Sequence, residues 1–283
     1  GSAANVTGAL GGPRPWSTTT VACPLSWAEL TAGFLHVRLT EVDGAWLRPV
    51  DVRACRRAVP QPRELAICTQ PLFNLHQHPR VLGDWLAYHR DVLGIDGSID
   101  VYDSDGSAAA ELQRSVTYFP RFQELLGSPW LEQAARLSNN YCTETLGDMH
   151  CLYRHRSLGT RRVLFLHSPD EFLFSPEHGE SAVSVLLWGL PDRLWADSSW
   201  LQLSARNFGG RDNGGPALSR FVHYDPVASD QGSFTALVNP AHTLSAHVHW
   251  ARPRRPDLHW WMAEASTLRV NHYLDLFAPR SAS

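Results

Sequence analysis

The stretch from Val163 to Phe174, Val-Leu-Phe-Leu-His-Ser-Pro-Asp-Glu-Phe-Leu-Phe, places an apolar run shortly before a pair of acidic residues. Such a run is typical of a buried central strand, and Pro169 marks its end because proline cannot donate to a sheet ladder. We therefore expect Asp170 and Glu171 at a carboxyl-terminal strand edge, where open α/β sheets bind their ligands. The alternative is that Asp170 caps a turn and Glu171 pairs with an arginine.

Composition limits the class of protein. The chain has 283 residues, 43% of them hydrophobic and 19% charged, which is enough to bury a large core. Its apolar runs are shorter than the roughly 20 residues of a membrane span, so we expect any membrane anchor to lie outside this sequence. A formal net charge of −3 with scattered arginines argues against binding to a nucleic-acid backbone. We expect a neutral or small anionic ligand instead.

The cysteines favour disulfides over a structural zinc site, because no Cys-x-x-Cys pair is present. Their spacing does not assign the pairing, and the odd number leaves at least one thiol without a partner inside the chain. Together with the glycosylation sequon Asn5-Val6-Thr7, they favour a secretory compartment. The five cysteines are Cys23, Cys55, Cys68, Cys142 and Cys151.

The order of predicted elements divides the chain into three regions. Residues 1–20 are rich in Gly, Pro, Ser and Thr and indicate a flexible lead-in. Residues 21–62 indicate a small β region, since alternating residues at 34–40 and 45–53 flank Asp43-Gly44, as in a hairpin. Residues 63–283 indicate the main domain.

The main domain has the pattern of an α/β protein. Apolar runs predict strands at 65–69, 99–102 and 162–166, and periodicity predicts helices at 81–93 and 146–156. Residues 182–188 and four later stretches also indicate strands. The glycine-rich residues 207–215, within 200–215, indicate a loop at the site.

The predicted strand at 99–102 ends in Asp103-Ser104-Asp105-Gly106-Ser107. This turn follows a βαβ unit, where a ribose or a phosphate meets carboxylates and backbone N–H groups. The alternative is an ordinary turn in which the aspartates accept hydrogen bonds from their own backbone.

Read together, five segments in order resemble glycosyltransferase family 92, the DUF23 group. The resemblance lies in a Trp-x-x-Tyr-His helix, a Tyr-Asp-x-x-Ser strand end, a Cys-Leu-x-Arg segment, an Asp-Glu-Phe centre and a late His-Tyr. It covers about residues 65–275. The segments are Trp85–Arg90, Leu93–Ser107, Cys151–Arg156, Phe165–Phe172 and Val270–Tyr273.

The resemblance implies a GT-A fold, a mixed sheet flanked by helices, and transfer of a hexose with inversion. The implied donor is a UDP-sugar, usually UDP-galactose, and the implied acceptor is a glycan or glycoprotein in the Golgi lumen. A divalent cation, Mn²⁺ or Mg²⁺, would neutralise the diphosphate. The resemblance places Asp103 near the donor's nucleoside, together with Ser104 and Asp105, and places His272 near the diphosphate, where Asp170 can be a metal ligand.

Ser168 departs from the family's Asp-x-Asp-Glu-Phe, because serine stands where the first aspartate belongs. Serine is neutral and a weak ligand for a hard cation. Three readings follow: a metal held by Asp170 and His272, metal-independent transfer that uses arginine or histidine, or no transfer at all. In the last case the 11 tryptophans suggest a non-catalytic carbohydrate-binding relative.

Other residues are candidates for the acceptor side of the site. His247 and His249, two apart on a predicted strand, are expected to point to one face and line the acceptor cleft. Asp212 in the glycine-rich loop is one candidate for the general base of an inverting displacement, and Asp197 is a second. A turn aspartate is the alternative for Asp212. A metallohydrolase is a further alternative function, but only the number of histidines, 14, suggests it, because the sequence has no His-x-x-x-His cluster.

Overall fold

The computed structural model describes residues 34–39, 50–55, 63–95, 99–112, 116–121, 141–177, 179, 183, 185–186, 195–209, 223–224, 234–273 and 276. The chain divides into two compact units, Gly1–Pro60 and Gln61–Ser283. In the first unit, β1 (Phe34–Leu39) pairs antiparallel with β2 (Val50–Cys55). This confirms the predicted pair of strands, with the second running to Cys55 instead of ending at Arg53.

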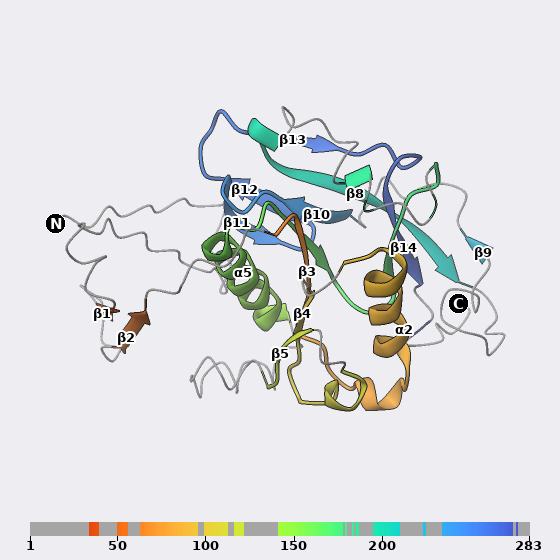
Figure 1. Ribbon diagram of the computed structural model, residues 1–283, viewed down its shortest axis with the longest axis horizontal. Helices are drawn as coiled ribbons and strands as arrows, with labels where there is room; N and C mark the ends of the chain where they lie inside the picture. Colours follow the sequence, from red (N-terminus) through yellow and green to blue (C-terminus); the bar gives the residue numbers. More distant parts are fainter. Residues whose placement is uncertain are drawn as a thin grey trace. The chain divides into compact units, whose positions relative to one another are not determined.

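The described part of the second unit is mixed α/β, built on one ten-stranded sheet (Figure 1). The strand order is β5-β4-β3-β6-β10-β8-β14-β7, and β13 and β9 also pair with β8. The first strands along the chain are β3 (Leu65–Thr69), β4 (Ile99–Tyr102), β5 (Thr117–Phe119), β6 (Arg162–Leu166) and β7 (Glu171–Phe174). The later ones are β8 (Ser198–Gly209), β9 (His223–Tyr224), β10 (Phe234–Val238), β13 (His259–Met262) and β14 (Arg269–Tyr273), while β11 (Thr243–His247) and β12 (Trp250–Pro253) form a separate hairpin.

Four parallel strands set the place of a ligand site. β3 pairs in parallel with β4 and β6, and β4 pairs in parallel with β5. Across the sheet these four strands lie in the order β5, β4, β3, β6. The strands therefore follow one another in one direction from β3 to β5, and β6 is added on the other side of β3, so the order reverses between β3 and β6. Open α/β sheets bind ligands outside the carboxyl ends of the strands at such a reversal. The carboxyl ends of β3 and β6 are therefore where a site is expected.

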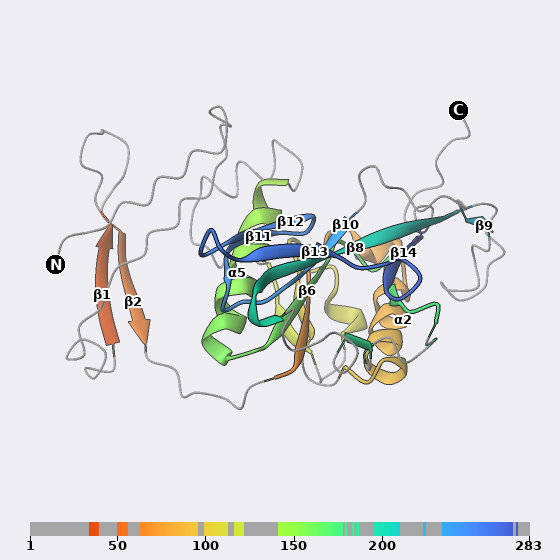
Figure 2. The same cartoon turned by 90° about the horizontal axis from the view of Figure 1, so that it is seen from above.

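Helices cover the two faces of this parallel region (Figures 1 and 2). Successive side chains of a strand point to opposite faces, so β3 contributes to two cores. Leu65 and Ile67 pack with the α2 side, and Ala66 and Cys68 pack with the α5 side. The helical elements are η1 (Leu75–Gln77), α2 (Val81–Ala87), η2 (Tyr88–Val92), η3 (Ala109–Glu111) and α5 (Tyr141–Leu158).

A disulfide joins Cys68 in β3 to Cys151 in α5, with the two Cα atoms 6.4 Å apart. It confirms the expectation of disulfides and fixes α5 on the sheet next to the strand-order reversal. Cys23 and the side chains of Cys55 and Cys142 lie outside the described residues.

The helix formed by α2 and η2 holds β7 through three buried side chains. Trp85 donates its indole N–H to the carbonyl of Glu171 at 2.7 Å, and Tyr88 donates its hydroxyl to the carbonyl of Leu173 at 2.7 Å. His89 accepts a hydrogen bond from the backbone N–H of Leu173 at 3.4 Å. The Trp-x-x-Tyr-His segment therefore positions the strand that follows Asp170.

His89 should make the stability of the fold sensitive to acid. It is fully buried, and burial lowers its pKa to about 3, while its Nδ1 donates to the carbonyl of Trp85 at 3.0 Å. In the unfolded chain histidine titrates near 6.5, so the contribution of neutral His89 is complete above that pH and is lost as the pH falls.

We expect the wild type to lose up to about 1.4 kcal/mol more unfolding free energy per pH unit below pH 6.5 than His89→Gln does. Urea unfolding of both proteins at pH 7.5, 6 and 5 measures this difference. Equal losses in the two proteins would show that His89 does not remain neutral in the fold.

Several predicted elements were wrong or missed. Residues 183 and 185–186 are helical where a strand was predicted over 182–188, and Trp200–Gly209 belongs to the long strand β8 instead of a loop. The strands β5, β7, β12 and β13 were not predicted, apart from Trp250 at the start of β12. Among the described helices, none combines the length and the apolar character that a bilayer span requires.

Candidate functional site

The turn between β6 and β7 holds the central acidic residues at the predicted strand edge. The hydroxyl of Ser168 donates to the carboxylate of Asp170, whose side chain is 8% exposed. Backbone hydrogen bonds fix the turn: Glu171 N–H donates to Ser168 at 3.1 Å, and Tyr273 N–H donates to the carbonyl of Asp170 at 2.8 Å. The position of Asp170 is therefore set by both neighbouring strands.

His272 reaches this turn from β14. That strand lies between β7 and β8, and its register places His272 opposite Glu171. The Nε2 atom of His272 is 3.5 Å from a carboxylate oxygen of Asp170. The sheet thus brings together the carboxylate and the imidazole that the sequence analysis paired as metal ligands.

Glu171 is buried behind the turn. Its carboxylate accepts a hydrogen bond from the backbone N–H of His167 at 2.7 Å. Burial raises the pKa of Glu171 to about 7, with His272 opposing and Asp170 adding to the rise. Glu171 can therefore carry or release a proton near neutral pH.

His167 connects the turn with α5 and with the β11–β12 hairpin. Its Nε2 is 3.9 Å from a carboxylate oxygen of Glu144, and its ring centroid is 5.1 Å from that of His249. Burial, reinforced by His249, lowers the pKa of His167 to about 3, and burial raises the pKa of Glu144 to about 7. His167 is therefore neutral at pH 7, and its contact with Glu144 is not an ion pair.

His247 and His249 lie together, with ring centroids 5.6 Å apart. They do not share a strand as predicted, because His247 ends β11 and His249 is in the turn before β12. The chain reverses between them, and the turn carries His249 to His167.

Asp148 lies one helical turn beyond Glu144 in α5 and was missed in the sequence. It is 1% exposed, and Gln70, just after β3, donates its amide N–H to one carboxylate oxygen at 3.4 Å. The other oxygen has no hydrogen-bond partner among the described residues. Burial raises the pKa of Asp148 well above its ordinary value, with the charge of Glu144 adding to the rise. The only sequence signal was the spacing of two acids by four residues on one helix face.

Asp170 and His272 offer two ligand atoms to a cation. Among the described residues, the one group of three or more His, Cys, Asp or Glu side chains close enough to share an ion is Cys68, Cys151 and His155. The two sulfurs of that group form the disulfide, so it is not an evident metal site. A cation at Asp170 would need further oxygen ligands from water or from a phosphate-bearing substrate.

The turn after β4 uses its aspartates internally. The carboxylate of Asp103 accepts hydrogen bonds from the backbone of Asp105, Gly106 and Ala108 and from the hydroxyl of Tyr118, at 2.6 to 3.2 Å. Asp105 accepts from Asn74 and Ser107, and the N–H of Ser104 donates to the carbonyl of Leu72. These contacts are those of a turn organised by its own carboxylates, which was the alternative reading.

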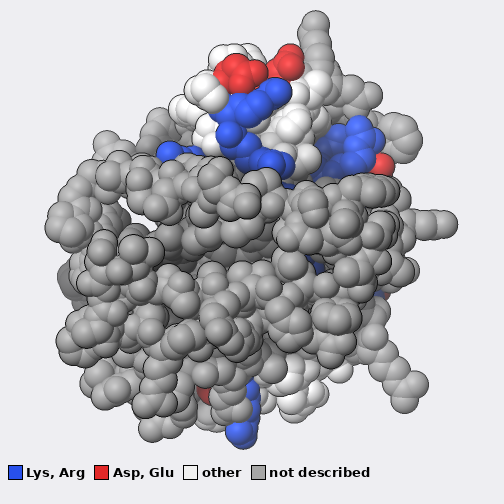
Figure 3. Space-filling model, turned by 90° about the vertical axis from the view of Figure 1, so that its left-hand side faces the viewer, with Lys and Arg blue, Asp and Glu red and all other residues white. Residues whose placement is uncertain are grey.

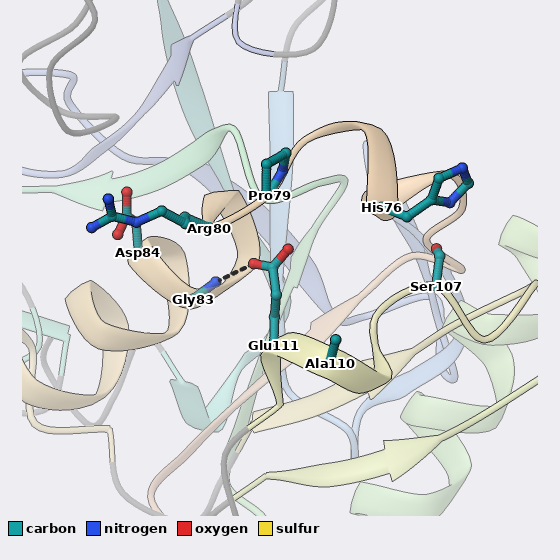
Figure 4. A pocket seen from close by; sticks show the side chains of 8 residues that line it. All are labelled: His76, Pro79, Arg80, Gly83, Asp84, Ser107, Ala110 and Glu111. Carbon is teal, nitrogen blue, oxygen red and sulfur yellow. Dashed lines mark hydrogen bonds between the residues drawn. The ribbon is translucent and has the colours of Figure 1, made fainter.

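A pocket of about 580 Å³ opens beside this turn, within the size range of small-molecule sites (Figure 4). Glu111 in η3 reaches across it and accepts a hydrogen bond from Gly83 N–H at 2.9 Å. Arg80 and Asp84 lie to one side of Glu111, and His76 and Ser107 lie to the other. The pocket is thus formed by the segments that follow β3 and β4.

The structure does not bring Asp197 to the turn at Asp170. Asp197 is exposed and directly precedes β8. Both β6 and β8 pair antiparallel with β10, and Val163 and Trp200 both lie opposite Val238. Asp197 therefore lies at the amino edge of these strands, whereas Asp170 follows the carboxyl end of β6. Asp212 lies outside the described residues.

Comparison of the chain with protein-family models and with curated proteins found no match.

Proposed function

We propose that this chain is a GT-A-type glycosyltransferase that transfers a hexose from a UDP-sugar to a glycan or glycoprotein. The transfer proceeds with inversion, and galactose is the first candidate for the hexose. One observation carries the proposal: carboxylates and imidazoles from α5, the β6–β7 turn, the β11–β12 hairpin and β14 meet where the strand order reverses. The ordered resemblance to family 92 supports the same reading. The disulfide is compatible with the oxidising lumen of the Golgi.

In this proposal Asp170 and His272 receive the diphosphate of the donor. Mn²⁺ or Mg²⁺ would neutralise that charge and stabilise the departing UDP. Because Ser168 supplies no carboxylate, the protein alone should hold the ion weakly, and phosphate oxygens of the donor would complete its shell. The nucleoside would lie beside the turn at 103–107, where Ser107 and Glu111 line the adjoining pocket.

Glu144 is a stronger choice for the general base than Asp197. It lies among the site residues, 3.9 Å from His167, and its side chain is 12% exposed. A carboxylate whose pKa is raised to about 7 by burial can take a proton from an acceptor hydroxyl near neutral pH.

Transfer by the wild type should rise with pH through about 7, because the base must be deprotonated. Glu144→Gln should lower kcat about a hundredfold and remove this limb, which a pH–rate profile from pH 5.5 to 8.5 measures. A profile of unchanged shape in the variant would assign the base to another residue.

A non-catalytic carbohydrate-binding protein is the second candidate, favoured by Ser168 and by exposed tryptophans. Trp250, Trp260 and Trp261 are 42%, 54% and 47% exposed, and indole faces stack well on sugar rings. Calorimetry with UDP separates the two functions. A glycan that binds where no nucleotide binds, with or without Mn²⁺, would favour this candidate over the transferase.

The metal should couple to the nucleotide. We expect UDP to bind the wild type about tenfold or more tightly in Mn²⁺ than in EDTA, and each ligand should raise the other's affinity equally. Ser168→Asp should tighten Mn²⁺ binding to the nucleotide-free protein and reduce this coupling. Equal UDP affinity in Mn²⁺ and EDTA for the wild type would remove the metal from the site.

A further inference from the structure

A second pocket, of about 520 Å³, lies at the opposite edge of the sheet from Asp170. It is formed by the end of α5, the turn into β6, the residues before β8 and the turn after β10. Because these segments are at the amino ends of β6 and β8, the pocket is separate from the proposed donor site. The described lining residues are Arg156, Gly159, Thr160, Arg161, Arg162, Trp195, Ala196, Asn239, Ala241 and His242.

Hydrogen-bond donors and positive charge dominate the lining. Three guanidinium groups, an imidazole, an amide and an indole are present, and no described lining residue carries a carboxylate. On the described part of the face in Figure 3, acidic side chains lie close to some of the arginines. The pocket therefore combines positive charge with a concave shape.

Arg162 places a buried cation against this pocket. It is 1% exposed, and its guanidinium carbon lies 5.0 Å from the centroid of the Trp195 ring. One Arg162 nitrogen is 3.6 Å from a carboxylate oxygen of Glu64, which also pairs with Arg161 at 3.2 Å. Glu64 and Arg161 are about half exposed, and such pairs contribute little. Because a guanidinium stays charged and holds its donors in a rigid plane, Arg162 adds a fixed positive charge to this side of the pocket.

Backbone contacts hold the surrounding donors in place. Arg156 donates to the carbonyl of Pro240 at 2.7 Å, and Asn239 donates to the carbonyl of Trp195 at 3.0 Å. The indole N–H of Trp195 is buried and has no hydrogen-bond partner among the described residues. An unpartnered buried donor is uncommon in a folded protein and gains free energy from any acceptor that reaches it.

We propose that this pocket is an oxyanion-binding site that takes a phosphate, sulfate or carboxylate group. Arg161 and Arg162 supply planar guanidinium groups, which bind such anions by paired, charge-assisted hydrogen bonds. Trp195 supplies a further donor.

The test is calorimetric titration of the whole chain with inorganic phosphate, inorganic sulfate and glucuronate at constant ionic strength. We expect saturable binding of at least one of them. Tighter binding of glucuronate would assign the site to a sugar carboxylate, and tighter binding of phosphate or sulfate would assign it to an inorganic or ester oxyanion. Arg162→Gln and Arg161→Gln should each weaken binding about tenfold or more.

One control removes the same kind of charge outside this pocket. Arg255 lies on an exposed segment, so Arg255→Gln should leave binding unchanged. If Arg162→Gln does not fold, Arg161→Gln and Trp195→Phe carry the test, because Arg161 is half exposed and phenylalanine preserves an aromatic face while removing the N–H. No saturable binding of any of the three anions, or binding that the arginine variants leave unchanged, would overturn the proposal.

Discussion

Replacing Asp170 by asparagine should lower hexose transfer about a hundredfold or more while leaving the thermal unfolding midpoint within a few degrees of the wild type. Asparagine keeps the shape of the side chain but removes the charge that faces His272 at 3.5 Å and would hold the cation. The turn itself is held by backbone hydrogen bonds that the substitution preserves. Steady-state kinetics and thermal unfolding of the same preparation measure both effects.

Asp257→Asn is the matched control, because the Asp257 side chain is 66% exposed and pairs with the similarly exposed Arg255 at the surface. It should change neither activity nor stability by a measurable amount. Unchanged transfer in Asp170→Asn would remove this residue from the site. A large loss of stability would instead assign it to the structure of the turn.

Removing the disulfide should destabilise the fold by roughly 4.5 kcal/mol, the loop-closure value for a loop of this size. Cys68 and Cys151 are 83 residues apart, so the bond greatly restricts the unfolded chain. In a domain of this size, each kcal/mol of lost stability lowers the thermal unfolding midpoint by about two to four degrees. The midpoint should therefore fall by about 10 °C or more. Thermal unfolding with and without a reducing agent measures it.

Variants of the two cysteines provide the internal control. Cys68→Ser, Cys151→Ser and the double variant should lose nearly the same stability, since each removes one and the same bond. A reducing agent should lower the unfolding midpoint of these variants less than that of the wild type, because they lack this bond. The same unfolding midpoint for the reduced and oxidised wild type would contradict the assigned pairing.

The parallel centre of the sheet could be predicted from the sequence because its strands are continuous apolar runs. β3 and β6 are buried along their whole length, which gives the strongest pattern that a strand can show. β5 has only three residues, and β13 has four that are exposed throughout, although three of them are apolar, so neither has the length and pattern of a buried strand. In β8, the glycines from Gly209 onward suggested a loop, although pairing with β14 and β9 keeps the strand regular as far as Gly209.

The strand edge at Asp170 and Glu171 could be predicted from the residues alone, whereas the pairing of Asp170 with His272 came only from the resemblance. Asp170 and His272 were placed together because the family pattern contains both, and the register of β14 provides the contact. Glu144 and Asp148 carried no signal beyond their spacing, because their importance comes from the packing of α5 against the ends of β3 and β6. Asp103 shows the opposite case, in which local hydrogen bonding to its own turn uses the carboxylate.

An assay of the wild type with a panel of UDP-sugars and glycan acceptors in Mn²⁺ tests the central claim most directly. UDP release and the mass of the acceptor are followed together, with Asp170→Asn as the inactive reference. We predict that one UDP-hexose gives acceptor-dependent UDP release and an acceptor heavier by one hexose, and that Asp170→Asn gives neither. If no donor in the panel yields a lengthened acceptor while glycans still bind to the protein, the chain is not a glycosyltransferase.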